Sequence, residues 1–92
     1  MNAPYRSTPV FDETTLPEAL RREHRTKAET WGVINVLEGS LRFTRPEPAF
    51  ETVLEAGEHI VIEPQQTHFV TPIGAMRMRV DFYDAPPEGT SI

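Results

Sequence analysis

Residues 24–43 read HRTKAETWGVINVLEGSLRF, and this stretch decides the fold class. Residues 31–37 are rich in β-branched types and fall into two alternating sets, which is typical of a strand with two different faces. Glu38-Gly39 then predicts a tight turn, because glycine adopts positive φ without steric cost. Residues 41–43 continue as the returning strand. The stretch therefore predicts a β-hairpin.

Further short strands and turns fill the second half of the chain. We expect strands over residues 50–54, 59–63, 68–70 and 76–83, separated by turns or loops at residues 56–57, 64–67 and 72–74. Strands this short and turns this frequent predict an all-β sandwich or barrel.

The segment TLPEALRREHRT, residues 15–26, has two interpretations. Thr15 with Glu18 forms a helix-capping pattern, whereas Leu20, Arg22 and His24 alternate as in a strand. We favour a helical turn near residues 14–18 followed by a strand from about Ala19.

Length and composition limit the possibilities. Ninety-two residues make a single domain, 1–92, with a core of about residues 8–85, an extended N-terminal arm and a C-terminal tail. No apolar run is long enough to span a membrane, and the N-terminus lacks a secretory signal, so we expect a cytoplasmic protein. The net charge of −5 argues against nucleic-acid binding. Exposed sheet edges favour a homodimer.

Two histidines are the leading candidates for chemistry. His24 and His68 lie in separate halves of the strand pattern, so only folding brings them together. The chain has no cysteine, so any transition metal must be held by imidazole and oxygen ligands. Such a centre needs more than two ligands, and we expect Glu63 to complete it. His59, beside a turn, is expected to face solvent.

Three further residues are candidates for substrate binding. Lys27 could bind an anion beside the histidines. Trp31 could form a wall of the pocket, although core packing is its commoner role. Asp81 stands between two apolar residues of a strand and needs a partner if it is buried, so a structural ion pair with a neighbouring arginine is the alternative to a site role.

The order of motifs resembles a family of small cupins. The motifs are HRTK (24–27), WG (31–32), LEG (37–39), the EPQ and His of EPQQTH (63–68) and VDFY (80–83). The family comprises YeaR-like proteins and the N-terminal domain of tellurite-resistance B proteins. The resemblance implies a single-domain cupin, a small jelly-roll barrel or β-sandwich, that is frequently dimeric. In the longer members a similar domain precedes an S-adenosylmethionine-dependent methyltransferase, whose glycine motif these residues lack, so methyl transfer is not expected.

Against the general cupin pattern, two motif-one ligands are replaced. Thr26 stands in place of a second histidine, and Gly32 in place of a glutamate. Three functions stay open. The first is a metal-binding cupin, with zinc or iron, that handles a small anion, for example in the response to a toxic oxyanion such as tellurite. The second is a metal-dependent isomerase or oxygenase for a small organic acid, with Glu63 or Asp81 as base. The third is a metal-free ligand-binding or interaction module.

Overall fold

The computed structural model describes residues 3–87, and within this range the chain is almost entirely β-structure. A single short 3-10 helix, η1, interrupts the strands of the described range. The elements in chain order are β1 (Arg6–Ser7), β2 (Phe11–Asp12), η1 (Glu18–Arg21), β3 (Trp31–Pro46), β4 (Ala49–Glu55), β5 (His59–Ile62) and β6 (Phe69–Tyr83). The all-β prediction is confirmed.

Two long strands, β3 and β6, form the centre of the sheet. They pair antiparallel from Trp31↔Tyr83 to Thr44↔Phe69, and their register shifts near Gly39. The predicted hairpin is wrong, because β3 runs through residues 38–39 as one bent strand. The predicted turn at residues 72–74 is likewise part of β6. Gly39 and Gly74 have positive φ, and each lies at a bend within a strand that stays paired. The pairing of β3 with β6 therefore continues past both glycines.

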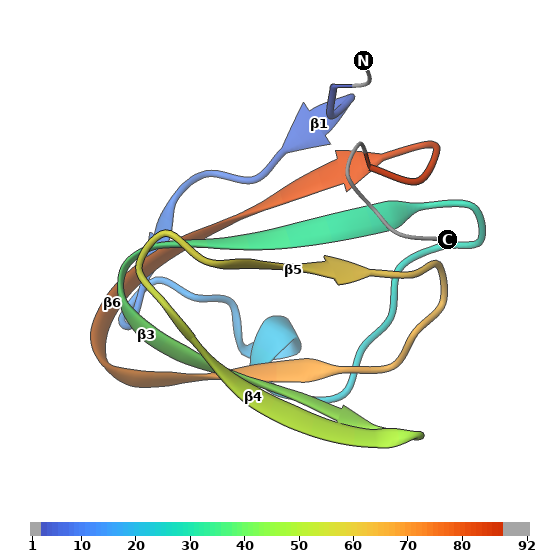
Figure 1. Ribbon diagram of the computed structural model, residues 1–92. Coiled ribbons are helices and arrows are strands. Elements are labelled where there is room, and N and C mark those ends of the chain that lie inside the picture. The colour runs from blue at the N-terminus through green and yellow to red at the C-terminus, as the bar shows by residue number, and fades with distance from the viewer. Residues whose placement is uncertain (1–2, 88–92) are drawn as a thin grey trace.

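The bends divide the sheet into two facing halves. The strand order is β1-β6-β3-β4, while β5 pairs with the first part of β3 and β2 with β6. Figure 1 shows β3 and β6 curving together on one side, so that β5 and β4 extend from the two halves of β3 at different levels. The result is an open barrel, as the resemblance to small cupins implied.

The core fills the space near the bend. Its most deeply buried side chains come from β3, β5 and β6 and are Phe43, Leu41, Ile62, Met78, Val36 and Val70. They alternate along each strand with residues of the outer face, as the pleat requires. The packing of these side chains fixes the register of the strands, because a slip by one residue would exchange the inner face with the outer one.

The N-terminal segment differs from the expected strand. Residues 18–21 form η1, and beyond it only His24 makes an isolated bridge to the sheet. Leu16 is buried in the core and Leu20 packs against it, a spacing that suits a helical turn covering one end of the barrel. Thr15 does not cap this helix, since its hydroxyl bonds to Asp12 instead.

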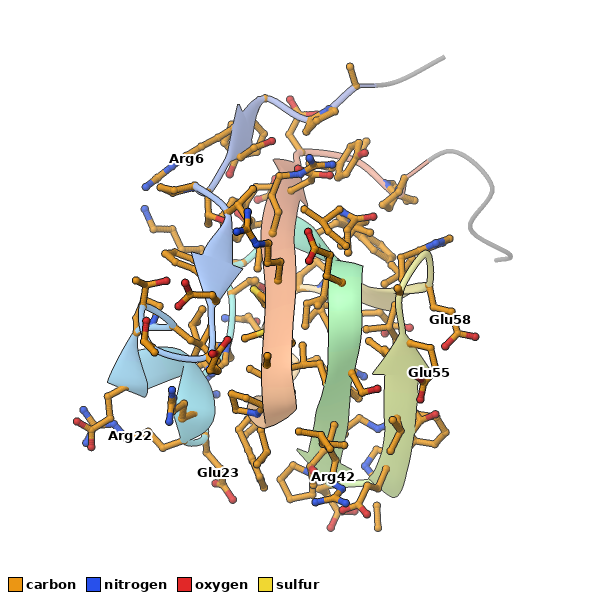
Figure 2. All side chains as sticks on the ribbon, turned by 90° about the vertical axis from the view of Figure 1, so that its left-hand side faces the viewer. Arg6, Arg22, Glu23, Arg42, Glu55 and Glu58 are labelled. Carbon is orange, nitrogen blue, oxygen red and sulfur yellow. The ribbon has the colours of Figure 1, made fainter. Side chains whose placement is uncertain are left out.

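Most charged residues of the described range lie on the outside of the barrel. Arg42, Glu55 and Glu58 project away from the sheet in Figure 2, in which the bend of β3 and β6 faces the viewer. No helix in the described part of the chain has the length and apolar character of a membrane span. The last part of the expected C-terminal tail, residues 88–92, lies outside the described residues, as do residues 1–2 of the expected arm.

Candidate functional site

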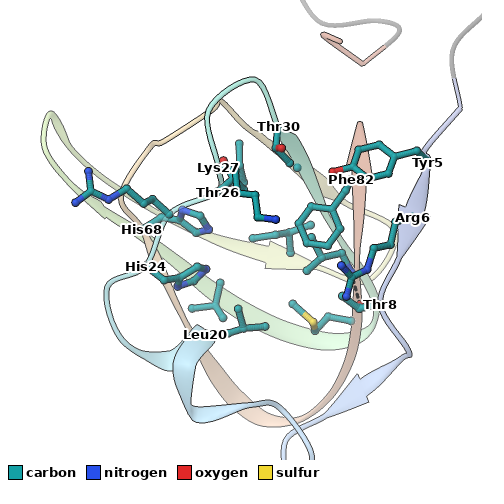
Figure 3. Close-up of a pocket in the computed structure, with 17 residues that line it drawn as sticks. Tyr5, Arg6, Thr8, Leu20, His24, Thr26, Lys27, Thr30, His68 and Phe82 are labelled. Carbon is teal, nitrogen blue, oxygen red and sulfur yellow. Dashed lines mark hydrogen bonds between the residues drawn. The ribbon is translucent and has the colours of Figure 1, made fainter. Parts of the chain in front are cut away.

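A cavity of about 250 Å³ opens into the barrel between its two halves. This is slightly below the range of about 300–1,000 Å³ that drug-sized ligands occupy, so it suits a small molecule. Its wall is built by the N-terminal arm, η1, the loop before β3, and the strands β3, β5 and β6 (Figure 3). The lining residues that matter below are Arg6, Leu20, His24, Arg25, Lys27, Ile34, Ile62, His68, Val70, Met78, Val80 and Phe82.

His24 and His68 meet at one side of this cavity, as predicted. Their backbones form an antiparallel bridge, with N–H···O distances of 3.0 and 2.9 Å in the two directions. Their ring centroids are 4.2 Å apart and the rings are tilted by 60°. Two residues separated by more than forty positions therefore present their imidazoles as one pair.

Both imidazoles are oriented by the same local contact. Nδ1 of His24 lies 3.0 Å from the carbonyl oxygen of Arg22, and Nδ1 of His68 lies 2.7 Å from that of Gln66. A carbonyl oxygen only accepts, so each Nδ1 carries the proton and donates it. In the neutral ring the lone pair then belongs to Nε2. Both rings point into the cavity in Figure 3.

His68 is a neutral residue near physiological pH. Its side chain is only 3% exposed, and Phe43 stacks on it with ring centroids 5.6 Å apart. Burial lowers the pKa of His68 from 6.5 to about 4, with a smaller contribution from the neighbouring His24, against the opposing effect of the hydrogen bond to Gln66. The cavity therefore contains a fixed hydrogen-bond acceptor.

The charged residues of the cavity wall are all basic. Arg6, Arg25 and Lys27 line it, and no Asp or Glu does so in the described part of the chain. Arg6 and Lys27 point into the cavity in Figure 3. The ion pairs found within residues 3–87 involve other arginines, namely Arg42, Arg77 and Arg79. The site thus presents positive charge that no carboxylate of the described residues neutralises.

Arg6 is held in the wall by the pairing of the N-terminal arm with β6. Arg6 pairs with Phe82, and its guanidinium carbon lies 6.0 Å from the centre of that ring. The amide of Thr8 donates to the carbonyl of Val80 at 2.9 Å, and the amide of Val80 donates to the hydroxyl of Thr8 at 3.0 Å. These contacts fix the arm against the sheet on both sides of Ser7.

Asp81 lies outside the cavity. Its neighbours Val80 and Phe82 line the cavity, so the pleat turns Asp81 to the opposite face. There it is 7% exposed and accepts hydrogen bonds from Ser7 Oγ at 2.7 Å, Asn35 Nδ2 at 2.9 Å and Arg79 Nε at 3.0 Å. The structure therefore places Asp81 in a structural network.

Trp31 and Glu63 are displaced from the wall for the same reason. Gly32 and Ile62 line the cavity, and Trp31 and Glu63 are their immediate neighbours in sequence. Within residues 3–87 no three His, Cys, Asp or Glu side chains gather in a way that could hold a metal ion, so Glu63 does not join the histidine pair. Lys27, in contrast, lines the cavity as expected.

Arg6 and Arg25 line the cavity but were not among the candidates from the sequence, and Arg6 is the harder of the two to find. It belongs to a segment that reads only as an extended arm, and nothing in that segment indicates that it pairs with β6. Its inward direction follows from the alternation of Arg6 and Ser7 once this pairing exists.

Comparison with known proteins gives a consistent result. A family model described as "TehB-like domain" matches residues 6–80. A Haemophilus influenzae protein named as a probable S-adenosyl-L-methionine-dependent methyltransferase TehB is 34% identical over 71 residues, which are 72% of this chain and 25% of that protein. The chain thus spans about a quarter of the length of the curated relatives that it matches.

Solved structures show the same fold. The crystal structure of Haemophilus influenzae TehB has a TM-score of 0.79 at 30% identity, over 87% of this chain and 30% of that one. A protein from Escherichia coli K12 has a TM-score of 0.83 at 22% identity, over 92% of both chains. A cupin-2 domain protein from Shewanella frigidimarina has a TM-score of 0.60 at 18% identity, covering 90% and 83%.

Proposed function

This chain belongs to the TehB-like domain family, and from its cavity we propose that it binds a small anionic molecule. The observation that carries the proposal is the sign of the charges in the wall. The full chain has 14 acidic and 9 Lys or Arg residues, yet the charged side chains that line the cavity in the described range are Arg6, Arg25 and Lys27. A wall of opposite sign to the whole protein favours an anion.

The cavity strengthens the interaction of these cations with an anion. Most of its lining is apolar, whereas Arg6, Arg25 and Lys27 are themselves exposed, so their attraction for an anion is that of charges near a protein surface, still stronger than in bulk water. Lys27 supplies a compact charge, whereas the Arg6 guanidinium can bind two oxygens of one carboxylate or oxyanion. The link of the family with tellurite resistance makes tellurite one candidate ligand among small anions.

Binding can be measured by isothermal titration calorimetry with tellurite, phosphate and small carboxylates. We expect at least one of them to bind the wild type and to bind Lys27→Gln and Arg6→Gln at least about 10-fold more weakly, the equivalent of about 1.4 kcal/mol each. Arg77→Gln is the matched control, because Arg77 pairs with Glu38 on the surface, and it should bind like the wild type. Failure of every anion to bind, or equal losses in all three variants, would refute the proposal.

A divalent metal ion at the histidine pair, zinc or iron, is a second candidate function. One observation favours it: both rings donate Nδ1–H to a backbone carbonyl, which is the contact that orients most metal-ligating histidines. The described residues fit only part of such a centre, because zinc and iron sites take about three or more protein ligands and only two are gathered here. Water or the bound ligand would fill the other positions.

Metal analysis of protein purified without an affinity tag tests this second candidate. It predicts stoichiometric zinc or iron in the wild type and in His59→Ala, whose histidine is exposed on β5, but not in His24→Ala. Absence of metal from the wild type would remove it and leave the anion proposal intact.

The geometry of the cavity supports catalysis less well than it supports ligand binding. The two acids considered as general bases for an isomerase or oxygenase, Glu63 and Asp81, do not line the cavity. The methyltransferase named among the relatives is about four times as long as the matched region, and the residues described here form only the cupin-like part. Ligand binding is therefore the function that these residues support best.

A further inference from the structure

The polar groups of the cavity are separated into two ends. The histidine pair lies on one side, and Arg6 lies on the opposite side, with Lys27 reaching in between them (Figure 3). The surface between these ends is apolar and is formed by Leu20, Ile34, Ile62, Val70, Met78, Val80 and Phe82. A ligand complementary to this cavity therefore carries different chemical groups at its two ends.

The histidine end accepts hydrogen bonds. His68 donates its Nδ1–H to Gln66, so the remaining ring nitrogen, Nε2, offers only a lone pair. A carboxylate has no proton to donate to it. A hydroxyl group does, and the interaction matters because a buried acceptor left without a partner costs about 1–3 kcal/mol.

The middle of the cavity disfavours a bare inorganic oxyanion. Such an ion is strongly hydrated, and an apolar wall does not replace the hydrogen bonds that it would lose. The volume of about 250 Å³ also exceeds what such an ion needs. At about 30 Å³ for a water molecule, the cavity has room for on the order of eight groups of that size. An apolar body of several carbons fills this space.

We propose that the ligand of this cavity is a hydroxylated organic carboxylate, with its carboxylate toward Arg6 and Lys27, an apolar body against the floor, and its hydroxyl donating to Nε2 of His68. This inference rests on the proposed anion-binding function and names its ligand class. Phe82 in the wall suits a planar body, since a ring lying against it would contact an aromatic face, and the Arg6 guanidinium carbon lies 6.0 Å from the centre of the same ring.

A series of probes tests the two ends without altering the protein. Titration calorimetry near pH 7 compares 4-hydroxybenzoate with benzoate, 4-methoxybenzoate, phenol, phosphate and tellurite. We expect 4-hydroxybenzoate to bind at least about 10-fold more tightly than benzoate, because only its hydroxyl donates to His68. The methoxy compound keeps the oxygen but lacks the proton and should show no such gain. Phenol should bind more weakly than 4-hydroxybenzoate because it lacks the carboxylate.

Two variants assign the ends to residues. Arg6→Gln, in the exposed arm, should reduce the advantage of 4-hydroxybenzoate over phenol. His68→Phe should remove the advantage of 4-hydroxybenzoate over benzoate. If this buried substitution prevents folding, the His68 ring signals in proton NMR spectra of the wild type should shift more with 4-hydroxybenzoate than with benzoate, and equal shifts would contradict the assignment. An unchanged hydroxyl preference in the folded variant contradicts the assignment.

The outcomes separate this inference from the function on which it rests. If phosphate or tellurite binds as tightly as 4-hydroxybenzoate, or if the hydroxyl gives no gain over benzoate, the ligand class is wrong while anion binding stands. If no anion of the series binds, both proposals are overturned. A preference for the hydroxylated carboxylate that depends on Arg6 and on the histidines supports both.

Discussion

Protonation of His68 makes the stability of this protein depend on pH in a defined window. The pKa of His68 is about 4 in the folded protein against 6.5 for the free side chain, because burial disfavours the charged ring. The unfolded chain therefore binds more protons than the folded one between these two values. Stability is complete above pH 6.5 and is lost as the pH falls toward 4.

The size of the effect follows from the two pKa values. Linkage gives a loss of about 2 kcal/mol between pH 7 and pH 5, and about 3 kcal/mol once the pH falls below 4. Asp12, whose pKa is lowered to about 2 mainly by the hydroxyl and backbone amide of Thr14, loses its own contribution only below about pH 4. The window from pH 7 to 5 thus isolates the histidine.

Urea unfolding followed by the fluorescence of Trp31, the single tryptophan, measures this loss. EDTA in the buffer keeps metal ions from competing for the ring. His68→Gln should be less stable at pH 7 but should lose about 2 kcal/mol less than the wild type on going to pH 5. His59→Gln, which changes an exposed histidine, should keep the wild-type pH dependence.

Parallel stability curves for the wild type and His68→Gln between pH 7 and pH 5 would refute this reasoning. Proton NMR of the imidazole Cε1–H in the wild type gives a second measurement that does not need the variant to fold. A His68 resonance that titrates near pH 6.5 would contradict the effect assigned to burial.

Two further predictions concern the bend and the core, and denaturant unfolding tests both. Gly74→Ala should lower the free energy of unfolding by about 1–2 kcal/mol, because alanine is strained at positive φ. Gly39→Ala should lower it by about 1–3 kcal/mol more, because a Cβ there would lie 2.1 Å from the carbonyl oxygen of Ala75. Equal losses in the two variants would show that the structure relaxes to relieve this close approach. Phe43→Ala should lower the free energy of unfolding by about 3–5 kcal/mol, because this ring is fully buried. Phe50→Ala, which changes an exposed ring on the neighbouring strand, should lower it by less than about half of that. The reverse order would contradict the assignment of the core.

The sequence predicted the fold class and the convergence of the two histidines correctly. Residues 31–37 are rich in β-branched residues, and apolar and polar residues alternate in residues 76–83, and both patterns indicate strands whatever their partners. The order and spacing of the two histidine motifs resembled the cupin pattern, and on this basis His24 was expected to lie beside His68. The expected homodimer and cytoplasmic location stay predictions.

The sequence did not show which face of each strand is inward. Trp31, Glu63 and Asp81 were each one residue away from a position that lines the cavity. A strand of period two gives two faces, and a small barrel carries apolar residues on both, as Val33 does outside and Ile34 inside. Only the curvature of the whole sheet decides between them.

Glycine at the bends was interpreted too locally. Gly39 follows Glu38 as it would in a two-residue hairpin, and positive φ is observed there. The difference lies in the partner: β6 bends at the same level, so β3 continues along it and does not turn back. A turn motif in one segment does not show whether a strand more than thirty residues away in sequence will pair with that segment.

The position of Asp81 on the outer face connects the fold to the site in another way. Its carboxylate joins Ser7 of the arm, Asn35 of β3 and Arg79 of its own strand, and so ties the arm to the two central strands. Arg6 is the next residue after Tyr5 and directly precedes Ser7, so the contact that holds Ser7 outside also holds Arg6 inside. An acidic residue excluded from the cavity by the pleat therefore supports the cation that faces the ligand.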